Sequence, residues 1–222
     1  MTLDEIQKIE DSRIPKGEID LIGVGRLGLR IGINLIQTHR GGPKTIRAFD
    51  GQKISGGDII FTLLGAKEGE YKTDFLKRIC THPKEFREIE SYPEYISDDN
   101  LNLIKGDIVI LILAGGNTIP TASMIIKDAH KRGAVTIGTA GIFGFGDEKI
   151  EFKDISEFGD DNPVVNELRL NGITENHLLI TTNKLIRDRE PVTPYTLDEV
   201  ADEITKNALK ILRDINDKNS NS

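Results

Sequence analysis

Three glycines in the first part of the sequence have the spacing of a phosphate-binding turn. Gly23, Gly25 and Gly28 follow a mostly apolar run that begins at Ile19, and a segment with helical apolar spacing comes after them. In a strand, turn and helix, Gly23 permits the tight turn, Gly25 lets a phosphate reach the backbone, and Gly28 allows close helix packing. The amide groups and positive dipole end of such a helix attract anions. We expect a nucleotide phosphate there, and the alternative is a purely structural turn.

Charged residues near this turn are suited to the rest of a nucleotide. Asp50 closes the expected strand 45–49, where a carboxylate commonly holds a ribose, although an aspartate at a strand end also favours a turn. Arg26 lies inside the glycine turn, and Lys53 and Lys72 follow the ribose position. A lysine in the first turn of a helix is unfavourable for the helix dipole, so Lys72 predicts a nearby anion. These cations are candidates to bind a triphosphate, and a solvated surface position is the alternative for each.

A third candidate segment follows the most apolar stretch of the chain. Residues 107–113 are continuously apolar after the first, as expected of a central parallel strand covered on both faces. Gly115, Gly116 and Asn117 come next, so they fall at the carboxyl edge of the sheet, where ligands of this architecture bind.

The elements that position these residues alternate between strand and helix, which predicts an α/β fold with a doubly wound, Rossmann-like, mainly parallel sheet. We expect strands at 19–22, 45–49, 86–92, 107–113, 134–138, 149–155 and 177–182. We expect helices near 2–10, 27–38, 69–80, 97–104 and 120–131, and a last helix opened by a capping box at Thr196–Glu199. The domain organisation is an arm at 1–18, one domain at 19–215 with a C-terminal extension from about 147, and a disordered tail at 216–222.

The composition excludes several classes of protein. The chain has 222 residues and a net charge of −7, with a pI near 5.2, which disfavours nucleic-acid and membrane-surface binding. The single cysteine, Cys80, excludes an intramolecular disulfide and a cysteine zinc cluster. No apolar run approaches the roughly 20 residues of a membrane span, and the acidic N-terminus is unlike a signal peptide, so we expect a cytoplasmic protein. The histidines lack metal spacing and are expected at the surface or at helix ends: His39, His82, His130 and His177.

Four motifs together resemble the ThiF/MoeB and ubiquitin-activating superfamily of adenylating enzymes, over roughly residues 19–152. They are the glycine turn, Phe49-Asp50 with the Ser55 loop, Gly69-x-x-Lys72, and Gly138-Thr139-Ala140-Gly141 leading through Phe143 and Gly144 into a strand. The resemblance implies that Lys72 touches the phosphates of ATP and that Asp50 holds the ribose. It also implies that a carboxylate is joined to AMP with release of pyrophosphate, with Mg²⁺ held mainly through the phosphates.

The chain departs from the family pattern at several positions. The usual asparagine and arginine after the second strand are missing from Ser55-Gly56-Gly57-Asp58-Ile59, and Asp50 stands without a second acidic residue. The family's aspartate after the fourth strand is replaced within Gly115-Gly116-Asn117. The zinc cysteines are absent, and Cys80 lies far from a thioester position, so we expect adenylation without a covalent relay and a packed thiol at Cys80.

A short, atypical member of this kind most resembles the proteins of iron-guanylylpyridinol cofactor assembly for the Fe-only hydrogenase of methanogens. That resemblance implies a pyridinol carboxylate as the substrate and transfer of the acyl group to a partner that forms a thioester. It also implies a homodimer in which an N-terminal arginine reaches the partner's ATP, for which Arg13 is the candidate. Thr181-Thr182-Asn183, Arg187 and Arg189 are candidates for a substrate region or a dimer contact.

Two other functions remain open from the residues alone. An NAD-dependent oxidoreductase would also use the glycine turn and Asp50, but the loop from Gly51 to Gly57 and Lys72 are surplus to that chemistry. A non-catalytic nucleotide-binding regulator would account for the missing family aspartate and arginine.

Overall fold

The computed structural model describes residues 1–11, 14–80 and 86–220, and its centre is a seven-stranded sheet. The strand order is β3-β2-β1-β4-β5-β7-β6, and all pairings are parallel except that of β6 with β7. The strands are β1 (Glu18–Ile22), β2 (Thr45–Phe49), β3 (Glu88–Tyr92), β4 (Ile108–Leu111), β5 (Val135–Thr139), β6 (Glu151–Asp154) and β7 (His177–Thr181). The strand order reverses between β1 and β4, which is the point where a doubly wound sheet binds its ligand. The predicted fold class is confirmed.

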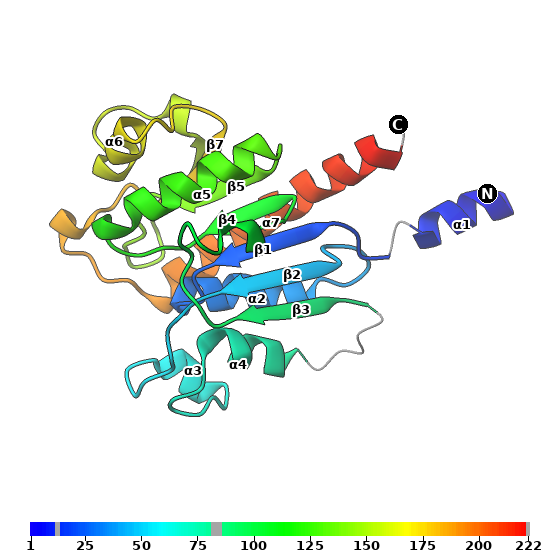
Figure 1. The fold of residues 1–222 in the computed structure, drawn as a ribbon, viewed down its shortest axis with the longest axis horizontal. Helices are drawn as coiled ribbons and strands as arrows, with labels where there is room; N and C mark the ends of the chain where they lie inside the picture. The colour runs from blue at the N-terminus through cyan, green and yellow to red at the C-terminus, as the bar shows by residue number, and fades with distance from the viewer. Residues whose placement is uncertain (12–13, 81–85, 221–222) are drawn as a thin grey trace.

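Helices cover both faces of the sheet (Figure 1). One face carries α2 (Arg26–Gln37), α4 (Lys72–Ile79) and α7 (Pro194–Ser220), and the opposite face carries α5 (Ile119–Lys131) and α6 (Pro163–Leu170). The other helices are α1 (Leu3–Asp11) and the short α3 (Ile59–Leu63), and the 3-10 turns are η1 (Leu101–Leu103), η2 (Gly116–Thr118), η3 (Ile155–Glu157) and η4 (Ile186–Asp188). Among the described residues, none of the helices combines the length and hydropathy needed to cross a bilayer.

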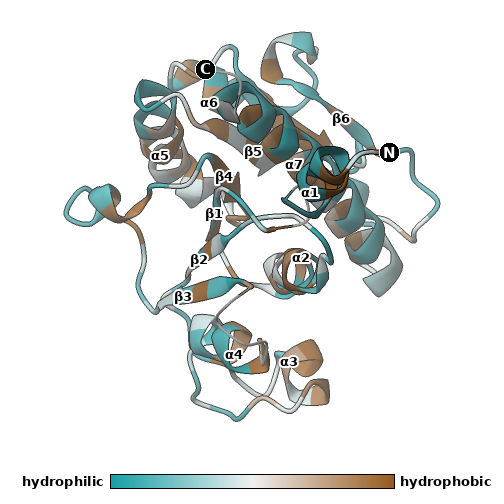
Figure 2. Cartoon of the chain, turned by 90° about the vertical axis from the view of Figure 1, so that its right-hand side faces the viewer, coloured by the Kyte–Doolittle hydropathy of each residue, from teal (hydrophilic) through white to brown (hydrophobic). Residues whose placement is uncertain are grey.

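The hydropathy colouring in Figure 2 shows apolar residues concentrated where the helices face the sheet. The central strand β4 is buried on both faces, as its continuous apolar sequence predicted. Ile108 and Ile110 belong to the core beneath α2 and α7, whereas Val109 and Leu111 belong to the core beneath α5. Burying each such side chain contributes about 1.5–3 kcal/mol. The strand end that leads to the candidate site is therefore packed against buried side chains on both faces.

The helix α2 ends in a cap made by a buried arginine. The guanidinium of Arg87, 6% exposed, donates hydrogen bonds to the carbonyls of Leu35, Ile36, Thr38, Gly41 and Pro43. These carbonyls include groups that a helix C-terminus leaves unpaired. β3 consequently begins at Glu88 rather than at Phe86, whose side chain is exposed.

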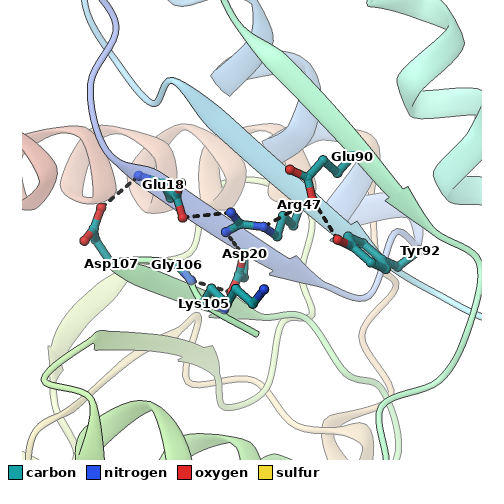
Figure 3. Close-up of polar contacts among 8 residues, drawn as sticks. All are labelled: Glu18, Asp20, Arg47, Glu90, Tyr92, Lys105, Gly106 and Asp107. Atoms are coloured by element: carbon teal, nitrogen blue, oxygen red, sulfur yellow. Dashed lines mark hydrogen bonds and ion pairs between the residues drawn. The ribbon is translucent and has the colours of Figure 1, made fainter. Parts of the chain in front are cut away.

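A charged row crosses the three strands on the β3 side of the switch point (Figure 3). Asp20, Arg47 and Glu90 are register partners on β1, β2 and β3. Arg47 pairs with Glu18 at 2.8 Å, and with Asp20 and Glu90 at 3.3 Å each. Burial raises the pKa of Asp20, although its carboxylate accepts backbone hydrogen bonds from Gly106 and Lys105. All these contacts stay within the sheet and its adjoining loop, so we assign the row a structural role.

The chain after residue 147 contains the main corrections to the sequence analysis. The last helix begins at Pro194, and Thr193 Oγ1 accepts a hydrogen bond from the backbone N–H of Thr196. The capping box at Thr196–Glu199 was therefore wrong, because the hydroxyl of Thr196 donates to the carbonyl of Gly144 instead. The helix continues to Ser220, through residues expected to form a disordered tail, and Asn216 Nδ2 donates to the carbonyl of Lys16 at 3.4 Å.

Other elements differ from expectation as well, and the short helix α3 was not predicted. The helix expected at 97–104 is only the 3-10 turn η1, because Asn100 Oδ1 accepts from the backbone N–H of Ser97 and holds a loop ahead of it. The helix α6 was missed, although Asn162 Oδ1 caps it by accepting from Val164 N–H and Pro163 occupies its first position. A capping residue followed by proline is a recognised helix start.

Candidate functional site

The glycine turn connects β1 to α2, and two of its glycines are required by packing. Gly23 has φ +95°, and a Cβ added to it would lie 2.2 Å from the carbonyl oxygen of Ile112. A Cβ on Gly28 would lie 2.0 Å from the carbonyl oxygen of Gly23. Gly25 differs, because no heavy atom lies within 4 Å of the position its Cβ would take. Of the three glycines of the turn, only Gly25 therefore has open space beside it.

The N-terminus of α2 faces this open space without a cap of its own. Gly25 occupies the N-cap position, it makes no side-chain hydrogen bond, and the first turn holds no acidic residue. Arg26, the first helical residue, has an exposed side chain. Unpaired amide groups and the positive end of the helix dipole therefore meet at Gly25, and Arg26 lines the same cavity as Gly25, a combination that favours an anion.

Asp50 is connected directly to the turn. Its Oδ2 accepts a hydrogen bond from the backbone N–H of Val24 at 2.8 Å, and its Oδ1 accepts one from that of Gln52 at 2.8 Å. The residue is 9% exposed. Each carboxylate oxygen keeps acceptor capacity beyond these bonds, so the arrangement fixes the carboxylate beside the turn and still allows it to bind hydroxyl groups.

The side chain of Lys72 is buried beside an acidic residue that the sequence analysis did not assign. Its Nζ lies 2.8 Å from Gln52 Oε1, 3.2 Å from Asp58 Oδ1, and 5.6 Å from the centre of the Phe61 ring. The position of Lys72 predicted a nearby anion, and the carboxylate of Asp58 is such an anion within the chain. Burial raises the pKa of Asp58, but hydrogen bonds from Ser55 and Lys72 outweigh it and hold that pKa below its usual value.

The glycine-rich loop after β2 is held in place by backbone pairing with the segment before α4. Ile54 N–H donates to the carbonyl of Glu70 at 2.8 Å, and Lys72 N–H donates to that of Gln52 at 3.1 Å. Lys53 Nζ lies 4.9 Å from the centre of the Tyr71 ring. The segments that carry Lys53 and Lys72 are therefore paired with each other, and Gln52 links them to Asp50, since its N–H donates to Asp50 and its Oε1 accepts from Lys72 Nζ. The convergence of the two lysines on a triphosphate stays a prediction.

Arg26 and Gly115 lie at a different part of the same sheet edge. They line a cavity of about 570 Å³, here called the glycine-turn cavity, whose wall also includes Gly25, Ile112 and Phe143. Arg26 is the one ionised side chain among the described residues that line it, and the others are mostly apolar. Asn117 lies in η2 with an exposed side chain and does not line the cavity, nor do Asp50, Lys53 and Lys72.

The glycine-turn cavity extends between the sheet and helices α5 and α6 as far as His177, which is 1% exposed. The prediction of a surface or helix-end position for this histidine was wrong. Burial lowers the pKa of His177 to about 3, and Thr136 Oγ1 lies 2.8 Å from its Nδ1. Gly138 leaves the room that this ring needs, since a Cβ there would lie 2.8 Å from His177 Nε2. The cavity therefore ends at a neutral imidazole.

Three remaining expectations concern residues away from the cavity. Arg13 and His82 lie outside the described residues. Cys80 is half-buried at the end of α4 and packs against the core, in agreement with the expected packed thiol. In the described ranges, no group of three or more His, Cys, Asp or Glu side chains is arranged to hold a metal ion.

Comparison with known proteins identifies two that are similar to this chain in sequence over most of its length. No family model matches the chain. A protein of Methanocaldococcus jannaschii, described as uncharacterized protein MJ0693, is 43% identical over 207 residues, which cover 93% of this chain and 81% of that protein. A solved structure of HcgE from Methanothermobacter marburgensis with guanylylpyridinol and ATP bound is 48% identical with a TM-score of 0.87, and the match covers 92% of this chain and 98% of HcgE.

A more distant structure shares the fold alone. The Escherichia coli tRNA N6-threonylcarbamoyladenosine dehydratase TcdA, in complex with ATP, has a TM-score of 0.75 at 14% identity, covering 97% of this chain and 91% of TcdA.

Proposed function

The chain belongs to the HcgE family of ThiF-like adenylating proteins, and from this we propose that it adenylates the carboxylate of guanylylpyridinol with ATP. The product would be an acyl-adenylate, with pyrophosphate released, on the route to the iron-guanylylpyridinol cofactor. One observation carries the proposal: a homologue that is 48% identical over nearly its whole length holds both guanylylpyridinol and ATP.

The geometry of the turn agrees with a bound nucleotide triphosphate. The uncapped N-terminus of α2 and the open space at Gly25 suit a phosphate group, and the Asp50 carboxylate beside the turn suits the ribose hydroxyls. In this proposal Lys53 and Lys72 bind the phosphates beyond the α-phosphate. The pairing of their two segments directly after Asp50 supports this role.

In the reaction, a carboxylate oxygen attacks the α-phosphorus of ATP in line with the leaving group. The new bond joins that oxygen to phosphorus, and the bond to the oxygen bridging the α- and β-phosphates breaks, so that pyrophosphate carries away the electron pair. Negative charge grows on the bridging oxygen and on the α-phosphate during this step. We propose that Arg26 and Lys72 stabilise this charge, because preorganised cations lower the barrier most where charge develops.

The glycine-turn cavity would hold the acceptor. It begins at Gly25 and Arg26, so a carboxylate at that end would lie next to the α-phosphate. Its apolar walls suit a heterocycle and exclude water, which would otherwise hydrolyse the acyl-adenylate. Gly115 also lines this cavity, and Gly116 and Asn117 follow it in η2.

Lys72 also needs to exchange partners in this account. Its ion pair with Asp58 occupies the ammonium group before ATP binds, at a distance of 3.2 Å. The phosphates of ATP would replace Asp58 as the partner of Lys72. Alternatively, Asp58 would stay beside Lys72 and also bind a Mg²⁺ ion that is held mainly by the phosphates. A magnesium ion commonly uses one or two carboxylates together with substrate phosphates, and Asp58 is the carboxylate in position to contribute.

We propose further that the chain acts as a homodimer and passes the acyl group to a separate protein that forms a thioester. The proposal of a separate thioester-forming protein rests on the position of Cys80, which is at the end of α4 and does not line the glycine-turn cavity. Size-exclusion chromatography coupled to light scattering tests the first part.

A pyrophosphate-release assay tests the main proposal. Purified protein with ATP, Mg²⁺ and guanylylpyridinol should release pyrophosphate and form AMP, and omission of guanylylpyridinol should abolish release. A matched reaction with an ester of the guanylylpyridinol carboxylate should be inactive, because the nucleophile is blocked. Hydrolysis of ATP to ADP, or release that does not depend on the carboxylate, would overturn the proposal.

A further inference from the structure

Three polar side chains form a continuous hydrogen-bonded chain between α5 and the glycine-turn cavity. His130 Nε2 lies 3.1 Å from Thr136 Oγ1, which in turn lies 2.8 Å from His177 Nδ1. His130 is in the last turn of α5, Thr136 is on β5, and His177 is the first residue of β7. His130 is half-buried, whereas Thr136 and His177 are 0% and 1% exposed. The chain therefore connects a half-buried helix end with the wall of the cavity.

The second ring nitrogen of His177, Nε2, faces the cavity. His177 and Gly138 both line the cavity, and Nε2 would lie 2.8 Å from a Cβ added to Gly138. Among the described residues, no hydrogen bond involves Nε2. In that same part of the chain, Ser123 Oγ is the one polar side-chain atom that is both fully enclosed and unpartnered, so Nε2 is not fully enclosed. Nε2 is therefore free to bond with a molecule in the cavity.

The hydroxyl group of Thr136 couples the protons of the two rings. It has one proton to donate, and its hydrogen-bond partners among the described residues are the two ring nitrogens alone. One of these nitrogens must therefore be bare. A cationic His130 carries a proton on each nitrogen, so its Nε2 donates and His177 Nδ1 must accept. The single proton of a neutral His177 is then on Nε2, which becomes a donor toward the cavity.

A neutral His130 permits the opposite arrangement. Its bare Nε2 accepts the hydroxyl proton of Thr136, and the hydroxyl oxygen accepts from Nδ1–H of His177. This arrangement leaves His177 Nε2 bare. It is favoured in an empty cavity, because a protein interior tolerates an unpaired N–H group less well than an unpaired acceptor. The His177 end of the cavity is then a hydrogen-bond acceptor.

Charged groups around the chain keep His177 neutral when His130 gains a proton. Burial lowers the pKa of His177 to about 3, the charge of His130 lowers it as well, and Asp154 at the end of β6 opposes both. β5 and β7 carry no ionisable side chain other than His177. The end of α5 adds three charged residues, of which the first and last form an ion pair: Asp128, Lys131 and Arg132. Of the two rings, His130 is therefore the one that takes up a proton first.

We propose that His130 and Thr136 are positioning residues that set, through His177, which hydrogen bond the glycine-turn cavity offers to a bound molecule. With His130 neutral, the His177 end of the cavity accepts a hydrogen bond, and with His130 cationic it donates one. By linkage, a carbonyl or carboxylate oxygen bound at this end favours the protonation of His130, whereas a bound N–H or O–H group opposes it. The inference goes beyond the proposed function, because it requires neither ATP nor the adenylation step.

Nitrogen NMR of the histidine rings in the protein alone tests the inference, since a bare ring nitrogen and a protonated one resonate far apart. In wild-type protein labelled with ¹⁵N-histidine, His177 should stay neutral between about pH 8 and 5.5 while its proton moves from Nδ1 to Nε2. The midpoint of this change should coincide with the titration of His130. A proton that stays on one nitrogen of His177 throughout, or a midpoint that differs from that of His130, would overturn the inference.

Four variants separate coupling through the chain from a general effect of pH. Thr136→Val removes the hydroxyl but keeps the branched shape, and His130→Gln removes the titrating ring, so the proton of His177 should not move in either. Thr136→Ser keeps the hydroxyl and should restore the movement, and His39→Gln, at an exposed histidine, should leave it unchanged. Because His130 is only half-buried, its variant keeps the test decisive if Thr136→Val does not fold.

Two results are to be kept apart. Movement of the His177 proton that persists in Thr136→Val or His130→Gln would overturn the inference and leave the proposed function intact. A wild-type protein that shows the coupled movement but releases no pyrophosphate would instead refute the proposed function alone.

Discussion

Gly25→Ala separates phosphate binding from folding, because this glycine alone of the turn has space around it. An added Cβ meets no heavy atom within 4 Å, and the backbone at Gly25, with φ −76° and ψ −164°, is accessible to alanine. The lower entropy of the unfolded alanine chain stabilises the protein by about 0.4–1 kcal/mol. Loss of the preferred glycine at an N-cap costs a similar amount, so the free energy of unfolding should change by less than about 1 kcal/mol.

The effect on ATP should be much larger. The new methyl group would occupy the space that the account assigns to a phosphate, and at least one charge-assisted hydrogen bond from the helix N-terminus would be lost. Such a bond contributes about 1.5–3 kcal/mol, which corresponds to roughly a 10- to 150-fold weaker affinity. Isothermal titration calorimetry with ATP measures this change, and urea denaturation of the same sample measures stability.

Gly23→Ala provides the contrasting case. Its Cβ would lie 2.2 Å from a backbone oxygen at a residue with φ +95°, so we expect a poorly folded protein rather than a folded one with weak ATP binding. A folded Gly25→Ala variant with wild-type ATP affinity would refute the reasoning, since the phosphate would then lie elsewhere.

Three further changes test other parts of the account. With ATP in the absence of Mg²⁺, Lys72→Met should weaken binding at least about tenfold by calorimetry, whereas Asp58→Asn, which frees Lys72, should not weaken it; equal losses would assign both residues to structure alone. Arg47→Met should lower the free energy of unfolding by about 3–5 kcal/mol in urea, because it leaves Asp20 buried without its cation, and a change below about 1 kcal/mol would contradict this. Burial lowers the pKa of His177 to about 3, so the unfolded chain binds its proton first and stability falls as pH drops below about 6.5. Between pH 7.5 and 5 the wild type should lose about 2 kcal/mol more than His177→Gln, and equal losses would contradict the burial effect.

The sequence predicted the fold well where local pattern and tertiary environment agree. The strand at β2 was bounded correctly, and the apolar run of β4 correctly indicated a strand that is buried on both faces. The glycine spacing also predicted the turn between β1 and α2 correctly, because the positive φ of Gly23 and the close approach at Gly28 both require glycine.

Other features depend on contacts between distant segments, which spacing does not encode. Asp58 became important only because the loop pairs with the segment before α4 and places Lys72 against it. His177 looks like a surface residue in sequence, yet it is buried because Gly138 on the neighbouring strand makes room for its ring. The capping box at Thr196 was a true local pattern, but Thr193 made the cap and the tertiary bond to Gly144 took the hydroxyl of Thr196.

The fate of the carboxylate oxygen tests the central claim most directly. Guanylylpyridinol labelled with ¹⁸O in its carboxylate is incubated with the protein, ATP and Mg²⁺, the acyl group is captured by a thiol, and the AMP is analysed by mass spectrometry. If the carboxylate attacks the α-phosphorus, the bridging oxygen leaves with AMP, which should then carry one ¹⁸O atom. Unlabelled AMP, or ADP formed together with labelled phosphate, would contradict adenylation.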